Sequence, residues 1–159
     1  MFTKSTYSED AIANYTMLSK QLDALLTGET NAIANLSNAS ALLNQFFDQI
    51  NWVGFYLMEN GELVLGPFQG LPACVRIPLG RGVCGTAATN KETVIVPDVH
   101  AFPGHIACDA ASQSEIVLPI LKDGKLIGVL DIDSPIKDRF SDQDAAGLEQ
   151  FIEVLVKHI

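Results

Sequence analysis

The chain has 159 residues, of which 48% are hydrophobic and 18% are charged, so it is long enough to bury a core and too apolar to be disordered. Its formal net charge of −9 argues against nucleic acid and anionic membranes as partners, because phosphate binding requires basic patches. The N-terminus lacks the apolar segment of a signal peptide and no run approaches the roughly 20 apolar residues of a membrane span, so we expect a soluble, cytoplasmic protein.

The first third of the chain predicts two helices followed by a β-hairpin. Apolar residues recur three or four positions apart over Ser8–Leu26, where Ser8 is the expected N-cap, and over Thr30–Phe47. The pattern then changes, because Asn51–Met58 is rich in aromatic and β-branched residues and precedes an Asn-Gly turn. Glu62–Phe68 is the returning strand of this hairpin.

The remaining elements are short and surround one long loop. The final helix begins at Ser141, with Asp144 three residues later as an acidic variant of the capping box. Before it, the sequence predicts an extended segment at Arg76–Leu79, a glycine-rich turn at Gly80–Thr86 that leads into a short helix, a strand at Thr93–Val96, an irregular loop at His100–Gln113, and a hairpin of Glu115–Leu121 and Lys125–Ile132.

This order of elements predicts an α+β fold in which a central antiparallel sheet has its helices mainly on one side. There is no internal repeat, linker or low-complexity segment. The glycine-rich turn is not read as a phosphate-binding loop, because it lacks the GxxxxGK[ST] pattern.

Longer segments of the sequence resemble a known family. LPILKDGKLIGVLDIDSP and FSDQDAAGLEQFIEVL resemble the C-terminal half of a GAF domain. INWVGFYL, LGPFQGLPAC, IPLGRGVCGTAA and VPDVHAFPGHIACDAASQSEIVLPI are similar to the free methionine-(R)-sulfoxide reductases, and the resemblance runs from about Tyr15 to the end. It implies a single GAF domain over residues 1–159 and thiol-dependent reduction of free methionine-(R)-sulfoxide. It further implies recycling by thioredoxin, no cofactor, and a homodimer, which the family commonly forms.

Cys108 is the candidate nucleophile. It lies in the irregular sequence PGHIACDAASQSEI, and loops held by a rigid sheet often carry reactive groups. His105, three residues earlier, is a candidate for lowering the pKa of Cys108, although a single nearby histidine is weak evidence. The loop by itself leaves a reactive and an inert thiol equally open, whereas the family resemblance implies that Cys108 attacks the sulfoxide sulfur.

A sulfenic acid on Cys108 needs a second thiol whose Cα comes within about 7 Å. The resemblance implies that Cys74 or Cys84 resolves it, and we favour Cys74, which lies in a loop. Cys84 stands between Gly82 and Gly85, where a small packing residue would also fit. A structural zinc site is not expected, because such sites use tight pairs such as CxxC and only one close Cys–His pair is present.

Three carboxylates are expected to converge beside the thiols. Asp131 and Asp133 alternate in the strand-like run VLDIDS and share a face, and Glu115 begins the partner strand. The alternative is a solvated face of an acidic protein. Crowded carboxylates repel, so at least one pKa should rise, and a neutral carboxyl can protonate the sulfoxide oxygen. The other carboxylates can hold the substrate ammonium. We favour Glu115 as the donor, because it is nearest in sequence to the Cys108 loop.

The substrate's remaining groups also have candidate partners. Trp52 and Tyr56 are four apart in a predicted strand and share a face. They are either core aromatics or an apolar wall around the S-methyl group, which the resemblance favours. The substrate carboxylate requires donors, and backbone N–H groups near Ile116 or Cys108 are candidates.

Two rival functions fit part of this pattern. A GAF domain that only senses or binds a small ligand would leave the three cysteines without a purpose. A different thiol enzyme, such as a peroxidase, would not need three carboxylates converging beside the thiol.

Overall fold

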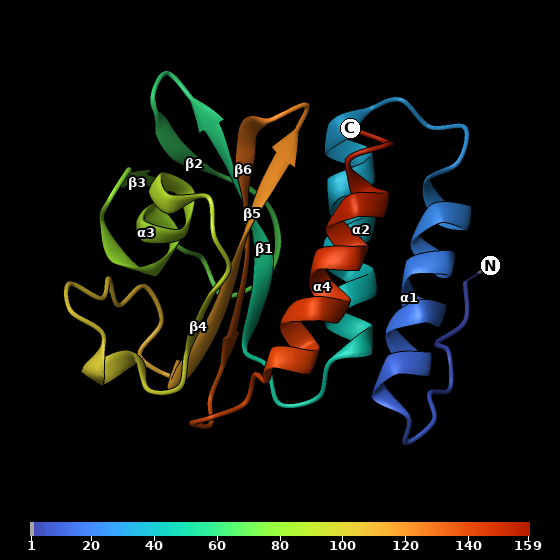
Figure 1. Ribbon diagram of the computed structural model, residues 1–159, viewed down its shortest axis with the longest axis horizontal. Coiled ribbons are helices and arrows are strands. Elements are labelled where there is room, and N and C mark those ends of the chain that lie inside the picture. Colours follow the sequence, from blue (N-terminus) through green and yellow to red (C-terminus); the bar gives the residue numbers. More distant parts are fainter. Residues whose placement is uncertain (1) are drawn as a thin grey trace.

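The fold is a six-stranded antiparallel sheet with the strand order β3-β2-β1-β6-β5-β4 and a layer on each face (Figure 1). It comes from a computed structural model that describes residues 2–159. The elements are α1 Ala11–Leu26, α2 Ala32–Phe46, β1 Trp52–Glu59, β2 Glu62–Gly70, β3 Arg76–Pro78, α3 Gly82–Asn90, β4 Val94–Val96, the 3-10 helix η1 Val99–Ala101, β5 Ser114–Lys122, β6 Lys125–Ser134 and α4 Asp142–Leu155. The predicted α+β class and element order are confirmed.

The two faces of the sheet have different coverings. Helices α2 and α4 pack on one face and α1 packs against them as an outer layer, so these three helices lie on one side as predicted, whereas α3 and the loop between β4 and β5 lie on the other (Figure 1). Side chains alternate along β1, so Val53 and Phe55 enter the core under the three helices. Trp52 and Tyr56 point to the α3 side and join a second, smaller core. The functional residues therefore belong to the α3 face.

The helix ends follow local hydrogen bonding. Ser8 is not the N-cap of α1, which corrects the prediction: Asp10 is the cap, and its side chain accepts from the N–H of Ala13. The capping box at the start of α4 is confirmed, with Ser141 and Asp144 bonding reciprocally. Within residues 2–159, no helix is both long enough and apolar enough to cross a membrane.

The pairing of β5 with β6 sets the positions of the acidic residues. Both strands are longer than predicted, so Asp133 lies inside β6 rather than after it. Glu115 is directly opposite Asp133, and Val117 is opposite Asp131. Because alternate residues of a strand share a face, this register brings the three carboxylates to the α3 side of the sheet.

Candidate active site

Two loops on the α3 side of the sheet are joined by a disulfide between Cys74 and Cys108. Their Cα atoms are 5.8 Å apart, within the range that a disulfide requires. Cys74 is half-buried between β2 and β3, and Cys108 is exposed in the irregular loop. Cys84, on α3, is buried and has a free thiol. Of the two partners that the sequence left open, the structure joins Cys74 to Cys108.

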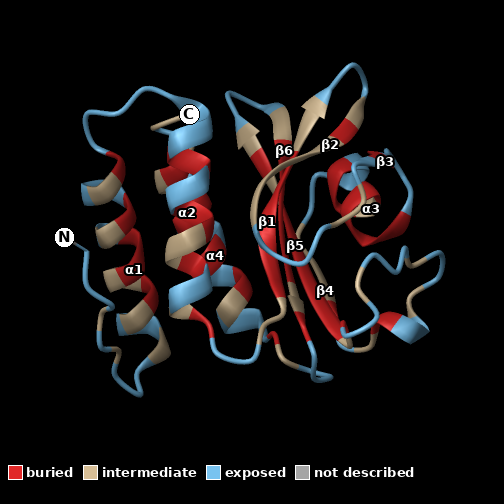
Figure 2. Cartoon of the chain, turned by 180° about the vertical axis from the view of Figure 1, so that it is seen from behind, coloured by how far each residue is buried: buried red, intermediate tan, exposed pale blue. Residues whose placement is uncertain are grey.

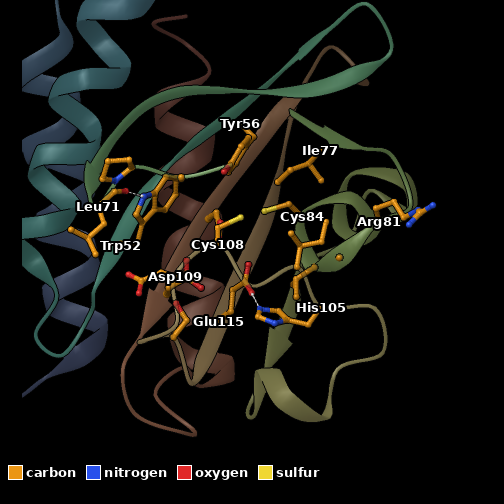
Figure 3. A pocket seen from close by; sticks show the side chains of 18 residues that line it. Trp52, Tyr56, Leu71, Ile77, Arg81, Cys84, His105, Cys108, Asp109 and Glu115 are labelled. Carbon is orange, nitrogen blue, oxygen red and sulfur yellow. Dashed lines mark hydrogen bonds and ion pairs between the residues drawn. The ribbon is translucent and has the colours of Figure 1, made fainter. Parts of the chain in front are cut away.

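A pocket lies beneath this disulfide, between the sheet, α3 and the two loops (Figure 3). Ile116 is not among the residues that line it, because its side chain packs in the core under the three helices. Cys74 does not line it either, although its neighbours Pro72 and Ala73 do. The other seven of the nine residues predicted for the site line the pocket, namely Trp52, Tyr56, Cys84, Cys108, Glu115, Asp131 and Asp133.

The floor of the pocket is a cluster of acidic groups around Cys84. Glu115 and Asp131 are only 5% and 6% exposed. Their carboxylate oxygens and the Sγ of Cys84 all lie within 4.8 Å of one another. Within the described residues, Oδ1 of Asp131 is buried without a hydrogen-bond partner. The predicted convergence is confirmed, and the alternative of a solvated acidic face is wrong for Glu115 and Asp131.

Burial and crowding raise the pKa values of these acids. Burial, assisted by the charge of Asp133, raises the pKa of Glu115 to about 8. Burial and the charge of Glu115 raise the pKa of Asp131, and burial and the charge of Asp131 raise the pKa of Asp133. Burial likewise raises the pKa of the Cys84 thiol. The cluster therefore titrates as one unit and carries at least one neutral carboxyl near pH 7.

His105 faces this cluster rather than Cys108. Its Nε2 is 3.7 Å from Oε2 of Glu115. Burial lowers the pKa of His105, so the ring is neutral near pH 7 and the contact is not an ion pair. A neutral imidazole supplies no positive charge to a thiol, and the structure therefore gives no support to the expected effect of His105 on the pKa of Cys108.

The two aromatic residues both wall the pocket and hold the loop that carries Cys74. Trp52 Nε1 donates to the carbonyl of Leu71 at 3.1 Å, and the hydroxyl of Tyr56 donates to the carbonyl of Cys74 at 2.8 Å. Trp52 also stacks between Tyr56 and Phe68, with ring centroids 5.9 and 5.2 Å away. The predicted wall is therefore also a clamp on the Cys74 loop.

A second clamp, on the Cys108 loop, was missed by the sequence analysis. Asn51, just before β1, donates from Nδ2 to Asp109 Oδ2 at 2.9 Å and to Ser112 Oγ at 3.1 Å. Asp109 and Ser112 line the pocket. The polar residues after Cys108 were the one available signal, and their partner lies more than 50 residues away in the sequence.

The start of α3 closes the pocket on the side opposite the aromatics. Arg81, Gly82 and Val83 line it together with Cys84. Gly82 has φ +61°, and a Cβ there would lie 3.1 Å from Ile106 of the Cys108 loop. Glycine thus permits both the backbone turn and the close approach of this loop to α3.

Fold and site together define an α+β domain with a small pocket, buried acids of raised pKa on its floor and a disulfide at its mouth. The profile of the GAF domain family matches residues 21–159. The chain is 60% identical over 159 residues to Protein YtsP of Bacillus subtilis, which covers 99% of this chain and 98% of that protein. It is 56% identical over 143 residues to the free methionine-R-sulfoxide reductase of Escherichia coli, covering 90% and 87% of the two chains.

Comparison with solved structures leads to the same family. The free methionine-R-sulfoxide reductase from Neisseria meningitidis, in complex with its substrate, is similar with a TM-score of 0.94 and 45% identity, over 99% of this chain and 95% of that chain. The chain belongs to the GAF domain family and, within it, to the free methionine-R-sulfoxide reductases.

Proposed function

We propose that this chain reduces free L-methionine-(R)-sulfoxide to methionine, with Cys108 as the nucleophile and Cys74 as the resolving thiol. The observation that supports this most strongly is the Cys74–Cys108 disulfide at the mouth of a pocket whose floor carries acids of raised pKa. That pocket combines a redox-capable thiol pair with a proton source. A domain that only binds a ligand needs neither the thiol pair nor the proton source. No feature of the pocket favours such a sensor over an enzyme.

In the proposed reaction the Cys108 thiolate attacks the sulfoxide sulfur while a neutral carboxyl protonates the sulfoxide oxygen. The protonated oxygen then moves to the sulfur of Cys108, and the bond between the two sulfurs and the substrate S–O bond both break. Cys108 is left as a sulfenic acid, and methionine leaves. The Cys74 thiol then attacks the sulfenic sulfur, forms the disulfide and releases water. The dithiol of reduced thioredoxin takes over the disulfide and returns both cysteines to thiols.

Glu115 is the proposed proton donor, and Asp131 and Asp133 are the proposed partners of the substrate ammonium. The mutual repulsion of the cluster supports this division, because one carboxyl stays neutral while another can ionise to pair with the ammonium. Trp52 and Tyr56 would surround the S-methyl group, and backbone N–H groups near Cys108 would bind the carboxylate. A pocket that pairs with both charges excludes methionine sulfoxide within a peptide.

The proposal also covers the setting of the reaction. Residues 1–159 act as one GAF domain, and the enzyme works in the cytoplasm, where thioredoxin keeps thiols reduced. The homodimer implied by the family resemblance remains a prediction that sedimentation would check.

The test is incubation of the protein with racemic free methionine sulfoxide, thioredoxin, thioredoxin reductase and NADPH. We expect half of the sulfoxide to be consumed, leaving the (S) epimer, with one NADPH oxidised per methionine formed. A peptide with internal methionine sulfoxide is the matched control and should remain unchanged. Consumption of the peptide, or no consumption of the free amino acid, would contradict the proposal.

The resolving role of Cys74 gives a first prediction. Cys74→Ser should release about one equivalent of methionine per chain and then stall when thioredoxin is the sole reductant, because the sulfenic acid has no partner thiol. Quantifying methionine against time checks this. Cys84→Ser is the control and should cycle. Sustained cycling of Cys74→Ser with thioredoxin would assign the resolving role to Cys84.

The raised pKa of Glu115 gives a second prediction. Below about pH 8 the donor is neutral, and above it the proton is lost, so kcat/KM should fall roughly tenfold per pH unit on the alkaline side. The profile is measured with saturating reductant, and Glu115→Gln should lack this alkaline limb. A rate that keeps rising with pH well beyond the pKa of Glu115 would show that no carboxyl of the cluster donates the proton.

A further inference from the structure

Large apolar side chains are exposed around the disulfide. Leu71 and Val75, on either side of Cys74, are 62% and 60% exposed. Leu79 follows β3 and is 40% exposed, and Ile106, two residues before Cys108, is 37% exposed. These four residues, which we call the apolar rim, are half of the eight exposed large hydrophobic residues found within residues 2–159. Figure 2 shows exposed segments of the chain on the α3 side of the sheet, and Figure 3 labels Leu71 beside the pocket.

The rim residues come from separate segments that the fold brings to the same pocket. The disulfide holds the Leu71–Val75 segment against the Cys108 loop, with Cα atoms 5.8 Å apart. Ile106 reaches the start of α3, where a Cβ on Gly82 would lie 3.1 Å from its side chain. Leu79 is three residues before Gly82. An apolar surface assembled from separate loops around one reactive group is typical of a protein-binding site rather than of scattered surface residues.

A positively charged side chain, Arg81, lies close to the rim in an otherwise acidic protein. The chain has a net charge of −9, which repels acidic partners in general. Arg81, exposed beside the rim, has no ion-pair partner in the part of the chain that the structure describes. A partner with an apolar contact face and acidic groups at its edge would complement this surface.

We propose that the apolar rim is the docking surface for a protein dithiol that reduces the Cys74–Cys108 disulfide. The proposal rests on the proposed function only in that the enzyme must be returned to its thiol form. A partner thiolate attacks one sulfur of the pair and forms an intermolecular disulfide, while the other sulfur leaves as a thiolate and takes up a proton. The second partner thiol then displaces the remaining cysteine, so both electrons come from the partner.

The test measures disulfide reduction directly, without methionine sulfoxide. The oxidised chain is mixed with reduced thioredoxin, and free thiols are trapped by alkylation and counted by mass spectrometry against time. The variant Val75→Ser/Leu79→Ser alters rim residues that do not line the pocket. The matched control is Ile12→Ser/Ile33→Ser, since these residues are 67% and 69% exposed on α1 and α2, across the sheet. Dithiothreitol replaces thioredoxin in a parallel series.

We expect the rim variant to react with thioredoxin about tenfold more slowly, because two apolar contacts of the encounter are lost. Its rate with dithiothreitol should match that of the unaltered chain, and the control variant should match it with both reductants. Three results would each overturn the proposal: an unchanged rate with thioredoxin, an equal loss in the control, or a parallel loss with dithiothreitol. The test contains no sulfoxide. A failure of this docking proposal is therefore distinguishable from a failure of the proposed reductase activity.

Discussion

Replacing Cys108 with serine should lower kcat/KM for free methionine sulfoxide by at least about 10⁴-fold. The reason is that the proposed nucleophile has no substitute, because an alcohol does not attack the sulfoxide sulfur under these conditions. Cys84, the remaining thiol of the pocket floor, is buried, and burial raises the pKa of its thiol, so it would not supply a thiolate. Methionine release with dithiothreitol as reductant measures the loss.

The controls separate chemistry from folding. Cys108 is exposed in a loop, so the reduced Cys108→Ser protein should unfold at the same temperature as the reduced parent. Cys84→Ser should retain the release of methionine that Cys108→Ser loses. Turnover of Cys108→Ser at the rate of the parent would require another nucleophile and would reject the assignment.

Replacing Glu115 with glutamine should lower kcat by a factor on the order of 10²–10⁴, the usual contribution of a general acid. The introduced amide would fill the same space and make similar hydrogen bonds, but it has no acidic proton to give. Asp131→Asn and Asp133→Asn should act chiefly through KM, because each removes a proposed partner of the substrate ammonium. Steady-state kinetics with free methionine-(R)-sulfoxide separates these two classes.

Asp138→Asn is the matched control for these variants, since Asp138 is exposed and lies outside the pocket. It should leave both kcat and KM unchanged. If the three pocket variants also kept near-normal kcat/KM, the carboxylates would have no part in the reaction. If Asp131→Asn alone lost kcat, the donor would be Asp131 rather than Glu115.

The sheet and its acidic face were predictable because strand periodicity is local. Alternation in VLDIDS was enough to give Asp131 and Asp133 one face, and the hairpin turn at residues 122–124 was enough to bring Glu115 to the adjoining strand. The hairpin turn alone does not set the register at the acids, because the pairing shifts by one residue between Ile120 and Leu121. Glu115 lies opposite Asp133 as a result of this irregularity, which the sequence analysis missed.

Contacts between distant segments were not predictable. Tyr56 and Cys74 are 18 residues apart, and Asn51 and Asp109 are 58 apart, with only the fold bringing each pair together. Which face of the sheet α3 would cover had no local signal either. The N-cap of α1 was misplaced because Ser8 and Asp10 are both good caps, and the structure uses Ser8 to bond Asn14 instead.

The choice between Cys74 and Cys84 as the partner of Cys108 likewise depends on contacts between distant segments. Both stand near glycine or proline in sequence, and both could approach Cys108 in some arrangement of the loops. The clamp from Tyr56 to the carbonyl of Cys74 turns that loop toward Cys108, whereas α3 packs Cys84 against the acids. The disulfide partner of Cys108 is thus selected by long-range contacts rather than by cysteine spacing.

A single-turnover experiment tests the central claim most directly. The fully reduced protein is given excess free methionine-(R)-sulfoxide without any reductant, methionine is quantified, and the disulfides are mapped by mass spectrometry of proteolytic peptides. The account predicts one methionine per chain, a disulfide between Cys74 and Cys108, and a free thiol on Cys84. Release of no methionine, or a disulfide that contains Cys84 in place of either partner, would contradict it.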